Sequence, residues 1–452
     1  MRNSFTGYVL SLFGLLSALL LGLGSCGVDR WPEYYPRTGR DLWIDSVMRE
    51  DYLWYEEIPS SESLNYFQEP EQFLSSLLSA SDHYSSVDTI YASLPPAYGF
   101  DYSLYATEED TVYNALVTYV IPGSPAEEAG LRRGDWIMQV DTIRLMRDNS
   151  EELLSAGGPR RLLLGRYVSL GEDEYGEAIG GVVADREVDL PSARGVTDVV
   201  VPCHSVFSQD GYTIGYLVYN SFSADADEQL RQLFRDFANQ GVGDLVLDLR
   251  YNEGGTSGSL QLLASLLAPS DAQGRVLASL QYNRKKADRN HDILLDTQNT
   301  NGGVNLGLST LYVLTSEATA AASEMLVNGL RPYMEVVVIG ETTAGDVVAT
   351  ADYTNPRYPW VLRPAVCYVY NAEGQADYAS GIRPDYSVGQ FDNLADVLPL
   401  GDPGEALLKA AIEYVLGQAP VRQAVSPVSR TFAGEKKLRR NFRKGLIVPA
   451  NP

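Results

Sequence analysis

The chain has 452 residues, with 59 Asp and Glu against 35 Lys and Arg, so its formal net charge is −24. This acidic balance argues against a nucleic-acid partner, because phosphate backbones are held by Lys and Arg surfaces. With 45% hydrophobic and 21% charged residues, the composition is that of a globular protein, and the length allows more than one hydrophobic core.

The first 25 residues have the pattern of an export signal. Arg2 precedes the apolar run 8–23, which is short for a membrane-spanning helix. The run ends in Leu-Gly-Ser-Cys (23–26), which resembles the lipobox of bacterial lipoproteins. We expect a signal peptide over 1–25, a lipid on Cys26 and a lipoprotein of the cell envelope, membrane-anchored and facing the periplasm or the cell surface. A plain secretory signal or an uncleaved anchor is the alternative.

The other cysteines and the histidines give no sign of a metal site. Two cysteines follow Cys26, and in an oxidising compartment they could form a disulfide or stay as buried thiols. The three histidines are scattered singly, without the spacing of zinc ligands. We therefore expect no metal and no cofactor from these residues: Cys203, Cys367, His83, His204 and His291.

Residues 26–90 predict a tether and an N-terminal helical region. Apolar residues at 43, 44, 47 and 48 lie on one face of a helix, and a second helix is expected over 70–78.

Short strands and turns dominate residues 91–195. Strands are expected over 112–121 and 136–140, with a short helix over 126–129 that Gly130 ends. The run from Gly123 to Asp141, GSPAEEAGLRRGDWIMQVD, resembles the most recognisable stretch of a bacterial PDZ domain. The resemblance implies that the segment Tyr98, Gly99 and Phe100 holds a peptide carboxyl terminus beside a strand that pairs with the peptide. A simple strand bulge is the alternative for these three residues.

Residues 205–415 alternate between strands and helices, which predicts a largely parallel sheet with helices packed against it. Strands are expected over 212–219, 245–249, 311–314 and 336–339, and helices over 224–240, 259–267 and 321–330. The remaining residues, 419–452, form a basic C-terminal tail in which six Lys and Arg face Glu435 within 431–444. We interpret it as a solvated tail, or as a segment that touches anionic lipid or the protein's own acidic surface.

Three segments of the α/β region resemble the carboxyl-terminal processing, or tail-specific, serine proteases. They are GYTIGYLVYNSF (211–222), DLRYNEGG (248–255) and TAAASE (319–324) with RPYMEVVVIGETTAGD (331–346). The resemblance implies an α/β, crotonase-like tail-specific protease core with an inserted PDZ β-domain and a small N-terminal helical region. It also implies that Gly254 and Gly255 donate backbone N–H groups to an oxyanion.

In that family a serine nucleophile and a lysine base act as a dyad. On this chain the nucleophile position is Ala321 and the lysine position is Asp346. A methyl group cannot form an acyl-enzyme, and a carboxylate has no hydroxyl beside it to activate. Ala321 alone would also fit a deliberate inactivation, but two losses in one dyad fit a pseudopeptidase better.

Two neighbouring hydroxyls are candidates for rescue of catalysis. Ser323 should point away from the Ala321 side chain if the helix has begun there, and Thr319 would more naturally cap that helix. The sequence therefore predicts a lipoprotein that binds extended polypeptide or carboxyl termini without cleaving it. The alternatives are an active serine endopeptidase, with its nucleophile altered or supplied by another residue, and a glycan-binding lipoprotein, prompted by 29 tyrosines.

Overall fold

The computed structural model describes residues 31–418, apart from 92, 110, 173–177 and 297–299, together with 432–436 and 445–450. The expected signal peptide and Cys26 lie outside the described residues. Among the helices that are described, none is both long and apolar enough to cross a membrane.

The centre of the molecule is a six-stranded sheet in the order β10-β11-β12-β16-β17-β22. The strands from β11 to β22 are parallel, and β10 joins the edge antiparallel. The predicted parallel sheet is therefore confirmed. The strands are β10 (His204–Gln209), β11 (Tyr212–Val218), β12 (Asp244–Asp248), β16 (Thr310–Thr315), β17 (Glu335–Gly340) and β22 (Tyr386–Ser387).

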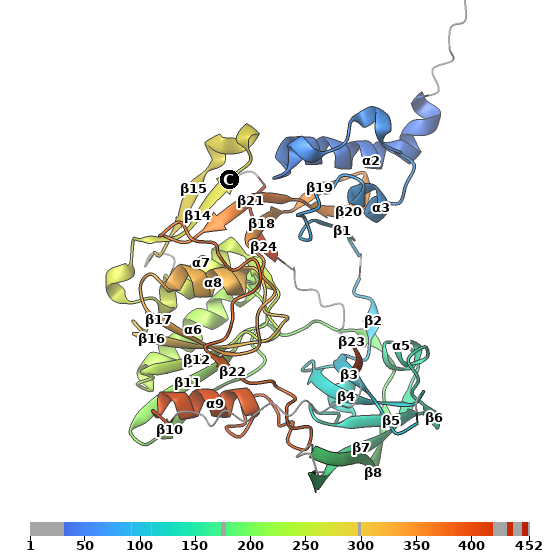
Figure 1. The fold of residues 1–452 in the computed structure, drawn as a ribbon, viewed down its shortest axis with the longest axis vertical. Helices are drawn as coiled ribbons and strands as arrows, with labels where there is room; N and C mark the ends of the chain where they lie inside the picture. The colour runs from blue at the N-terminus through green and yellow to red at the C-terminus, as the bar shows by residue number, and fades with distance from the viewer. Residues whose placement is uncertain are drawn as a thin grey trace, which may run out of the picture.

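Helices cover both faces of this sheet (Figure 1). Alternate strand residues, such as Leu245 and Leu247, pack with α6, α7 and α8, whereas Val246 packs on the other side with α9. This alternation explains why the middle positions of β12, β16 and β17 are all apolar. The helices are α6 (Asp227–Asn239), α7 (Ser257–Leu267), α8 (Ala322–Leu330) and α9 (Ala406–Val415), with one 3-10 turn, η3 (Ala224–Ala226), before α6.

A second sheet, in the order β13-β24-β18-β21-β14-β15, packs above these helices (Figure 1). Its strands are β13 (Gly254–Thr256), β14 (Val276–Tyr282), β15 (His291–Leu294), β18 (Val348–Ala351), β21 (Ala365–Tyr370) and β24 (Gly445–Val448), with 3-10 turns η4 (Ser270–Ala272) and η5 (Arg284–Arg289).

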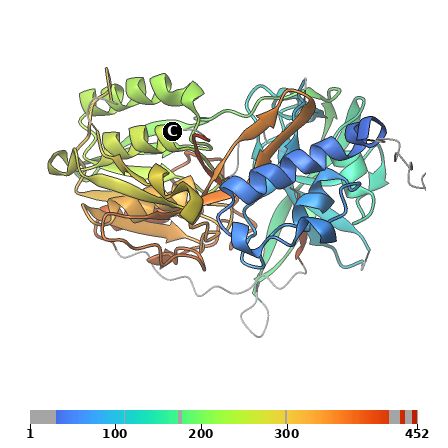
Figure 2. The ribbon, with the colours of Figure 1, turned by 90° about the horizontal axis from the view of Figure 1, so that it is seen from above.

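The N-terminal region is helical, as expected, and continues into a three-stranded sheet. Helix α2 lies beside the β19–β20 hairpin, and Trp43 contacts Tyr358 with ring centroids 6.2 Å apart (Figure 2). Helix α3 is three residues shorter than predicted, because the chain turns after Ser75. The elements are α2 (Trp31–Asp51), η1 (Tyr55–Glu57), η2 (Ser61–Ser63), α3 (Pro70–Ser75), β1 (Ser86–Thr89), β19 (Tyr353–Asn355) and β20 (Tyr358–Arg363).

The PDZ region is a separate β-sheet with its own apolar core. The sheet order is β23-β3-β4-β5-β7-β8, with β6 attached to β5 and a small β2–β9 pair beside it. The elements are β2 (Pro96–Ala97), β3 (Phe100–Ala106), β4 (Tyr113–Val120), α4 (Pro125–Glu128), β5 (Trp136–Val140), β6 (Ile143–Arg144), α5 (Ser150–Leu154), β7 (Arg160–Glu172), β8 (Ala178–Leu190), β9 (Arg194–Gly195) and β23 (Phe432–Lys436).

The described parts of the C-terminal segment differ from a solvated tail. Residues 432–436 form β23 at the edge of the PDZ sheet, and residues 445–448 form β24 between β13 and β18 of the core. Leu446 and Val448 are buried. The basic composition of 431–444 gave no sign of a strand. Both strands pair with partners far away in the sequence, so local patterns could not predict them.

Candidate active site

Three loops meet where three neighbouring parallel strands end. They follow β12, β16 and β17, and carry residues 249–255, 316–321 and 341–346. The Ala320 N–H donates to the Asn252 carbonyl at 3.1 Å, and the Ala344 N–H donates to the Thr319 carbonyl at 3.0 Å. The carboxyl ends of parallel strands are the usual place for a site in α/β proteins. The fold therefore brings the predicted motif segments together.

Ala321 lies in a strained turn immediately before α8. Its φ is 51° and its ψ is −103°, and its side chain is buried. A non-glycine residue in such a conformation costs about 1–3 kcal/mol and persists only where its surroundings enforce it. Sharp, strained strand-to-helix turns are how many hydrolases present a nucleophilic side chain. The turn at Ala321 is of this strained kind, although alanine supplies no nucleophile.

Glu324, in the first turn of α8, holds the strained turn to the loop after β17. Its buried carboxylate accepts the Ala321 N–H at 2.8 Å, and the Gly345 and Asp346 N–H groups at 2.6 and 2.8 Å. It also accepts the Thr343 hydroxyl. Burial raises the pKa of Glu324, and these hydrogen bonds oppose the rise. The sequence pattern contains Glu324 at the end of TAAASE (319–324) but does not predict this role.

Asp346 lies in a partly buried and negatively charged environment, beside the Glu324 carboxylate that accepts its N–H. Burial, and then the charges of Asp346 and Glu324, raise the pKa of Tyr84 to about 12. The same causes raise the pKa of Tyr378. Asp346 therefore adds a negative charge at the position that the sequence resemblance assigned to a lysine.

Both hydroxyl candidates are buried and already engaged. The Thr319 hydroxyl donates to the Leu249 carbonyl at 2.9 Å, and the Ser323 hydroxyl donates to the Asn252 carbonyl at 3.1 Å. Thr319 does not cap the helix, contrary to our expectation, because its oxygen accepts the Ser316 N–H instead. Neither hydroxyl has a basic partner among these hydrogen bonds.

Gly254 and Gly255 lie where two other chain segments pass close by. Their φ angles are +122° and +140°, and an added Cβ would come within 2.2 Å of the Gly445 carbonyl oxygen or the Phe222 carbonyl oxygen. The Gly254 N–H donates to the Asn252 side chain at 2.9 Å. The packing of β13 therefore requires both glycines, Gly254 against β24 and Gly255 against the segment that follows β11.

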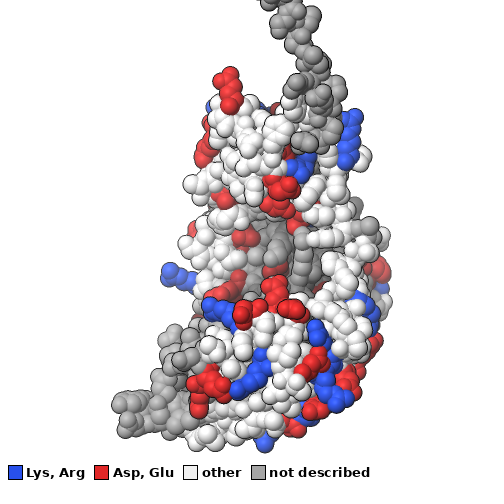
Figure 3. Space-filling view, turned by 90° about the vertical axis from the view of Figure 1, so that its right-hand side faces the viewer, with Lys and Arg blue, Asp and Glu red and all other residues white. Residues whose placement is uncertain are grey.

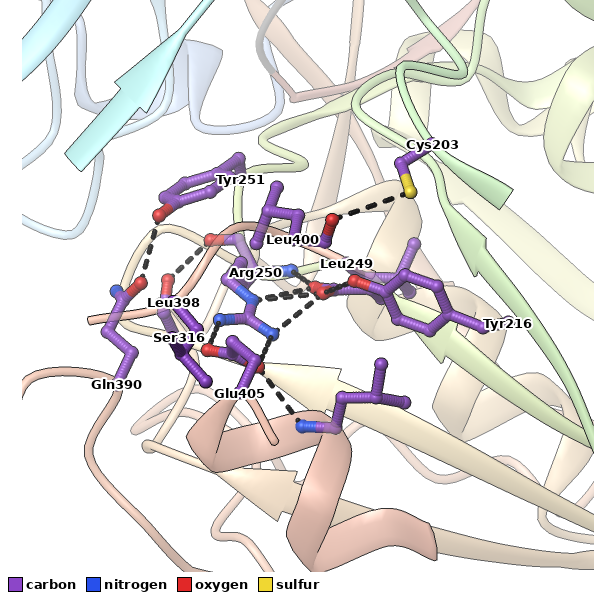
Figure 4. Close-up of polar contacts among 12 residues, drawn as sticks. Cys203, Tyr216, Leu249, Arg250, Tyr251, Ser316, Gln390, Leu398, Leu400 and Glu405 are labelled. Atoms are coloured by element: carbon purple, nitrogen blue, oxygen red, sulfur yellow. Dashed lines mark hydrogen bonds and ion pairs between the residues drawn. The ribbon is translucent and has the colours of Figure 1, made fainter. Parts of the chain in front are cut away.

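A buried cluster of charges lies below these loops (Figure 4). Arg250, fully buried, is 2.8 Å from Asp248 and 2.6 Å from Glu405, the N-cap of α9. Tyr216 donates its hydroxyl hydrogen to Asp248 at 2.8 Å. Burial alone would raise the pKa of Glu405, but the charge and hydrogen bonds of Arg250, the charge of Arg133 and the Leu408 N–H together outweigh it and lower the pKa to about 2. The Asp-Leu-Arg motif is therefore a structural support of the site.

Arg133 connects the PDZ domain to this cluster. It comes from the PDZ turn after α4, and its guanidinium donates to the Tyr251 hydroxyl at 2.7 Å and lies 3.6 Å from Glu405. It also donates to the Gln390 side chain and the Leu398 carbonyl. The side chain is 5% exposed. Its place in a PDZ motif gave no signal of this role.

The three residues of the expected peptide loop lie at the start of β3. Tyr98 is buried, and its hydroxyl donates to the Gly158 carbonyl at 2.6 Å. Gly99 has φ +91° and packs so closely on Ser124 that no Cβ would fit. Phe100 begins β3 and pairs with Val120. The loop therefore lies at the beginning of β3, in a geometry that depends on the glycine.

Cys203 and Cys367 are both free thiols in the structure, and burial raises the pKa of Cys367 to about 12. Among the described residues, His, Cys, Asp and Glu side chains form no group that could hold a metal ion.

The fold and site together define a peptidase scaffold of the α/β type that carries a PDZ domain. Family models agree: Peptidase family S41 matches residues 213–388, the Peptidase S41 N-terminal domain matches 41–86, and a PDZ domain matches 116–165. A crystal structure of an S41 protease candidate from Bacteroides fragilis has 43% identity and a TM-score of 0.78, over 83% of this chain and 97% of that one. The chain belongs to peptidase family S41.

Relatives with names are more distant. The carboxyl-terminal-processing protease of Synechocystis is 23% identical over 70% of this chain and 68% of its own length. Carboxy-terminal processing protease CtpA of Bacillus subtilis is 24% identical over 72% and 66%, and the enzyme of Picosynechococcus is 28% identical over 50% and 49%. The chain thus spans between half and two thirds of the length of these curated relatives.

Proposed function

We propose that this protein is a pseudopeptidase: a lipid-anchored member of its family that binds extended polypeptide and does not cleave it. The observation that carries the proposal is the turn at residue 321. The strained backbone of a nucleophile is kept there, but the side chain is a methyl group. The position of the family's lysine carries Asp346, whose N–H is bonded to a second carboxylate.

The neighbouring hydroxyls support the loss of catalysis. A nucleophilic hydroxyl needs a base within hydrogen-bond reach and a path to the substrate. Thr319 and Ser323 are fully buried, and each donates its proton to a backbone carbonyl. Freeing either one would require rearrangement of a loop that Asn252 and Glu324 hold in place.

Polypeptide binding is supported by the parts that are kept. The PDZ domain is kept, and its strand β3 follows the Tyr98–Phe100 loop, where a peptide strand would pair by β-augmentation. The family relationship implies a polypeptide substrate for its active members. The anchor at Cys26 is proposed from the lipobox alone, and would hold the protein at a membrane of the cell envelope.

The test uses an unfolded polypeptide, reduced and carboxymethylated α-lactalbumin, with the purified protein. We expect binding without any time-dependent fragment in mass spectrometry. The double variant Ala321→Ser with Asp346→Lys should gain cleavage, because the serine returns to a strained turn and the lysine to a loop that Glu324 already holds beside it. The single variant Ala321→Ser is the matched control and should stay inactive. Cleavage by the unaltered protein would establish the active endopeptidase instead.

A further inference from the structure

The outer edge of β3 is where a PDZ domain takes its peptide, and here it is occupied. On one side β3 pairs with β4, and on the other side it pairs with β23, residues 432–436 (Figure 1). The pairing is antiparallel, with Phe432 opposite Tyr105 and Lys436 opposite Tyr102, and one irregularity between Phe432 and Gly434. A segment near the end of the chain thus completes the PDZ sheet.

The polarity of β23 is that of a peptide ligand. Because Lys436 lies opposite Tyr102 and Phe432 opposite Tyr105, the segment runs toward the beginning of β3. The Tyr98–Phe100 loop lies at that end. A peptide that pairs by β-augmentation and presents its carboxyl end to this loop would run in the same direction. Residues 432–436 therefore stand in the position of a bound peptide.

This segment is internal, so its binding does not need a free carboxylate. The chain continues beyond Lys436 and reappears as β24, which begins at Gly445. In the loop itself, the Tyr98 N–H donates to the Ser155 carbonyl at 3.4 Å. Because residues 432–436 pair with β3 although the chain continues beyond them, the edge of β3 accepts the backbone of a segment in the middle of a chain.

The segment is also tethered close to its site. Eight residues separate Lys436 from Gly445, which pairs with Gly254 in the core sheet and whose N–H donates to the Glu253 carbonyl at 2.9 Å. A short tether gives an effective concentration in the millimolar range. Any polypeptide in solution must compete with it.

Charge favours the same arrangement. Within 431–444, six Lys and Arg face one Glu, whereas the whole chain has a net charge of −24. Asp and Glu side chains gather around a hollow on the face that carries the PDZ domain (Figure 3). A basic segment is attracted to an acidic protein, and the attraction is weakened by salt.

We propose that residues 432–436 are an internal ligand of the PDZ domain, bound along the outer edge of β3, and that another extended polypeptide gains this edge only by displacing them. The displacement rests on the proposed polypeptide-binding function, whereas the internal pairing itself does not. The chain continues from β23, at the edge of β3, to β24, which pairs with Gly254 beside the candidate site. Eight residues separate these two strands.

The pairing is tested by amide hydrogen exchange on the full chain. The variant Gly434→Pro with Glu435→Pro loses two N–H groups of β23, whereas Gly434→Ala with Glu435→Ala keeps both. Within residues 102–105, we expect the N–H groups that face β23 to exchange about tenfold faster in the proline variant than in the unaltered protein, and those that face β4 to stay protected. The alanine variant should match the unaltered protein. Equal exchange of residues 102–105 in all three proteins would overturn the proposal.

A cross-link in an otherwise unaltered sheet gives an independent answer. Glu435 lies directly opposite Ser103, so the variant Ser103→Cys with Glu435→Cys should form an intramolecular disulfide between these positions on mild oxidation. Ser103→Cys with Ala433→Cys, which are not paired, is the control. A disulfide that forms equally in both variants, or in neither, would contradict the pairing, even if the proline variant does not fold.

Displacement is measured with carboxymethylated α-lactalbumin. The proline variant should bind it about tenfold more tightly than the alanine variant, because no internal strand competes. Equal affinity of the two variants would refute the competition while leaving the binding function in place. A loss of binding in every variant, with the pairing still present in hydrogen exchange, would instead refute the binding function.

Discussion

Two buried carboxylates in the core are held in opposite ways. Glu324 is surrounded by three backbone N–H groups and one hydroxyl, and burial raises its pKa. Glu405 faces Arg250 at 2.6 Å and Arg133 at 3.6 Å, and its pKa falls to about 2. Both lie at the beginning of a helix. The difference comes from the partners: neutral donors in one case and cations in the other.

The two carboxylates support different parts of the molecule. The cluster around Glu405 joins the PDZ domain, the core sheet and α9, so we expect it to support the fold. The cluster around Glu324 shapes the turn at Ala321 and the loop of Asp346, so we expect it to support the geometry of the site.

The largest effect is expected from removing the cation of the first cluster. Arg250→Ala leaves Asp248 and Glu405 buried without their shared charge partner, which should lower the free energy of unfolding by about 3–5 kcal/mol. Urea denaturation measures it. Arg235→Ala, which removes an exposed pair with Glu228, is the control and should cost about 1 kcal/mol or less. An equal loss of stability in Arg250→Ala and Arg235→Ala would contradict the distinction between the buried and the exposed ion pairs.

The next effect is a dependence on pH. The pKa of Glu405 is lower in the folded protein, about 2, than its ordinary value of 4.5, so its stabilisation is present above pH 4.5 and is lost as the pH falls toward 2. Glu405→Gln should flatten this acid loss by about 3 kcal/mol in unfolding experiments between pH 5 and 2. Glu413→Gln, on the same helix, should keep the loss. An unchanged slope in Glu405→Gln would contradict the pairing.

Glu324 should respond with the opposite sign. Its pKa is raised in the folded protein, so its contribution to stability declines as the pH rises through the interval above its ordinary value. Glu324→Gln should remove this decline and should cost about 1–3 kcal/mol, because the amide cannot accept all four hydrogen bonds. Faster amide exchange at residues 343–346 checks the cause, with the exposed Glu317→Gln as control. Unchanged exchange there would mean that Glu324 does not hold the loop.

The smallest effect concerns the turn itself. Ala321→Gly relieves the strain at φ 51° and should raise the free energy of unfolding by about 1 kcal/mol. Ala322→Gly, one residue into α8, should lower it by about 0.5–1 kcal/mol. Thermal unfolding of both variants gives the comparison. A loss of stability in both would show that the backbone at Ala321 is not strained.

The sequence predicted the part of the fold that local patterns encode. The parallel strands β11, β12, β16 and β17 and the helix α6 were expected from local sequence patterns, and α6 buries Leu230, Leu233, Phe234 and Phe237. The glycine signals of the PDZ region also agree, since Gly130 has a positive φ after α4.

The rest depends on contacts between distant parts of the chain. Two short segments near the C-terminus, 432–436 and 445–448, flank a basic stretch and could not be recognised as strands from the sequence. The first forms a strand because it pairs with β3, and the second because it pairs with β13 and β18. The positive φ of Ala321 has no local signal either, because alanine does not favour it. The sequence motifs contain Glu324 and Arg133 but do not predict what these side chains contact, because their partners lie in other loops.

The central claim is that the turn at residue 321 keeps its geometry without a nucleophile, and labelling with a serine-reactive phosphonate tests it most directly. Mass spectrometry should find no adduct on the unaltered protein, and an adduct at position 321 in the variant Ala321→Ser with Asp346→Lys. An adduct on Thr319 or Ser323 of the unaltered protein, lost when that residue is changed to alanine, would contradict the account.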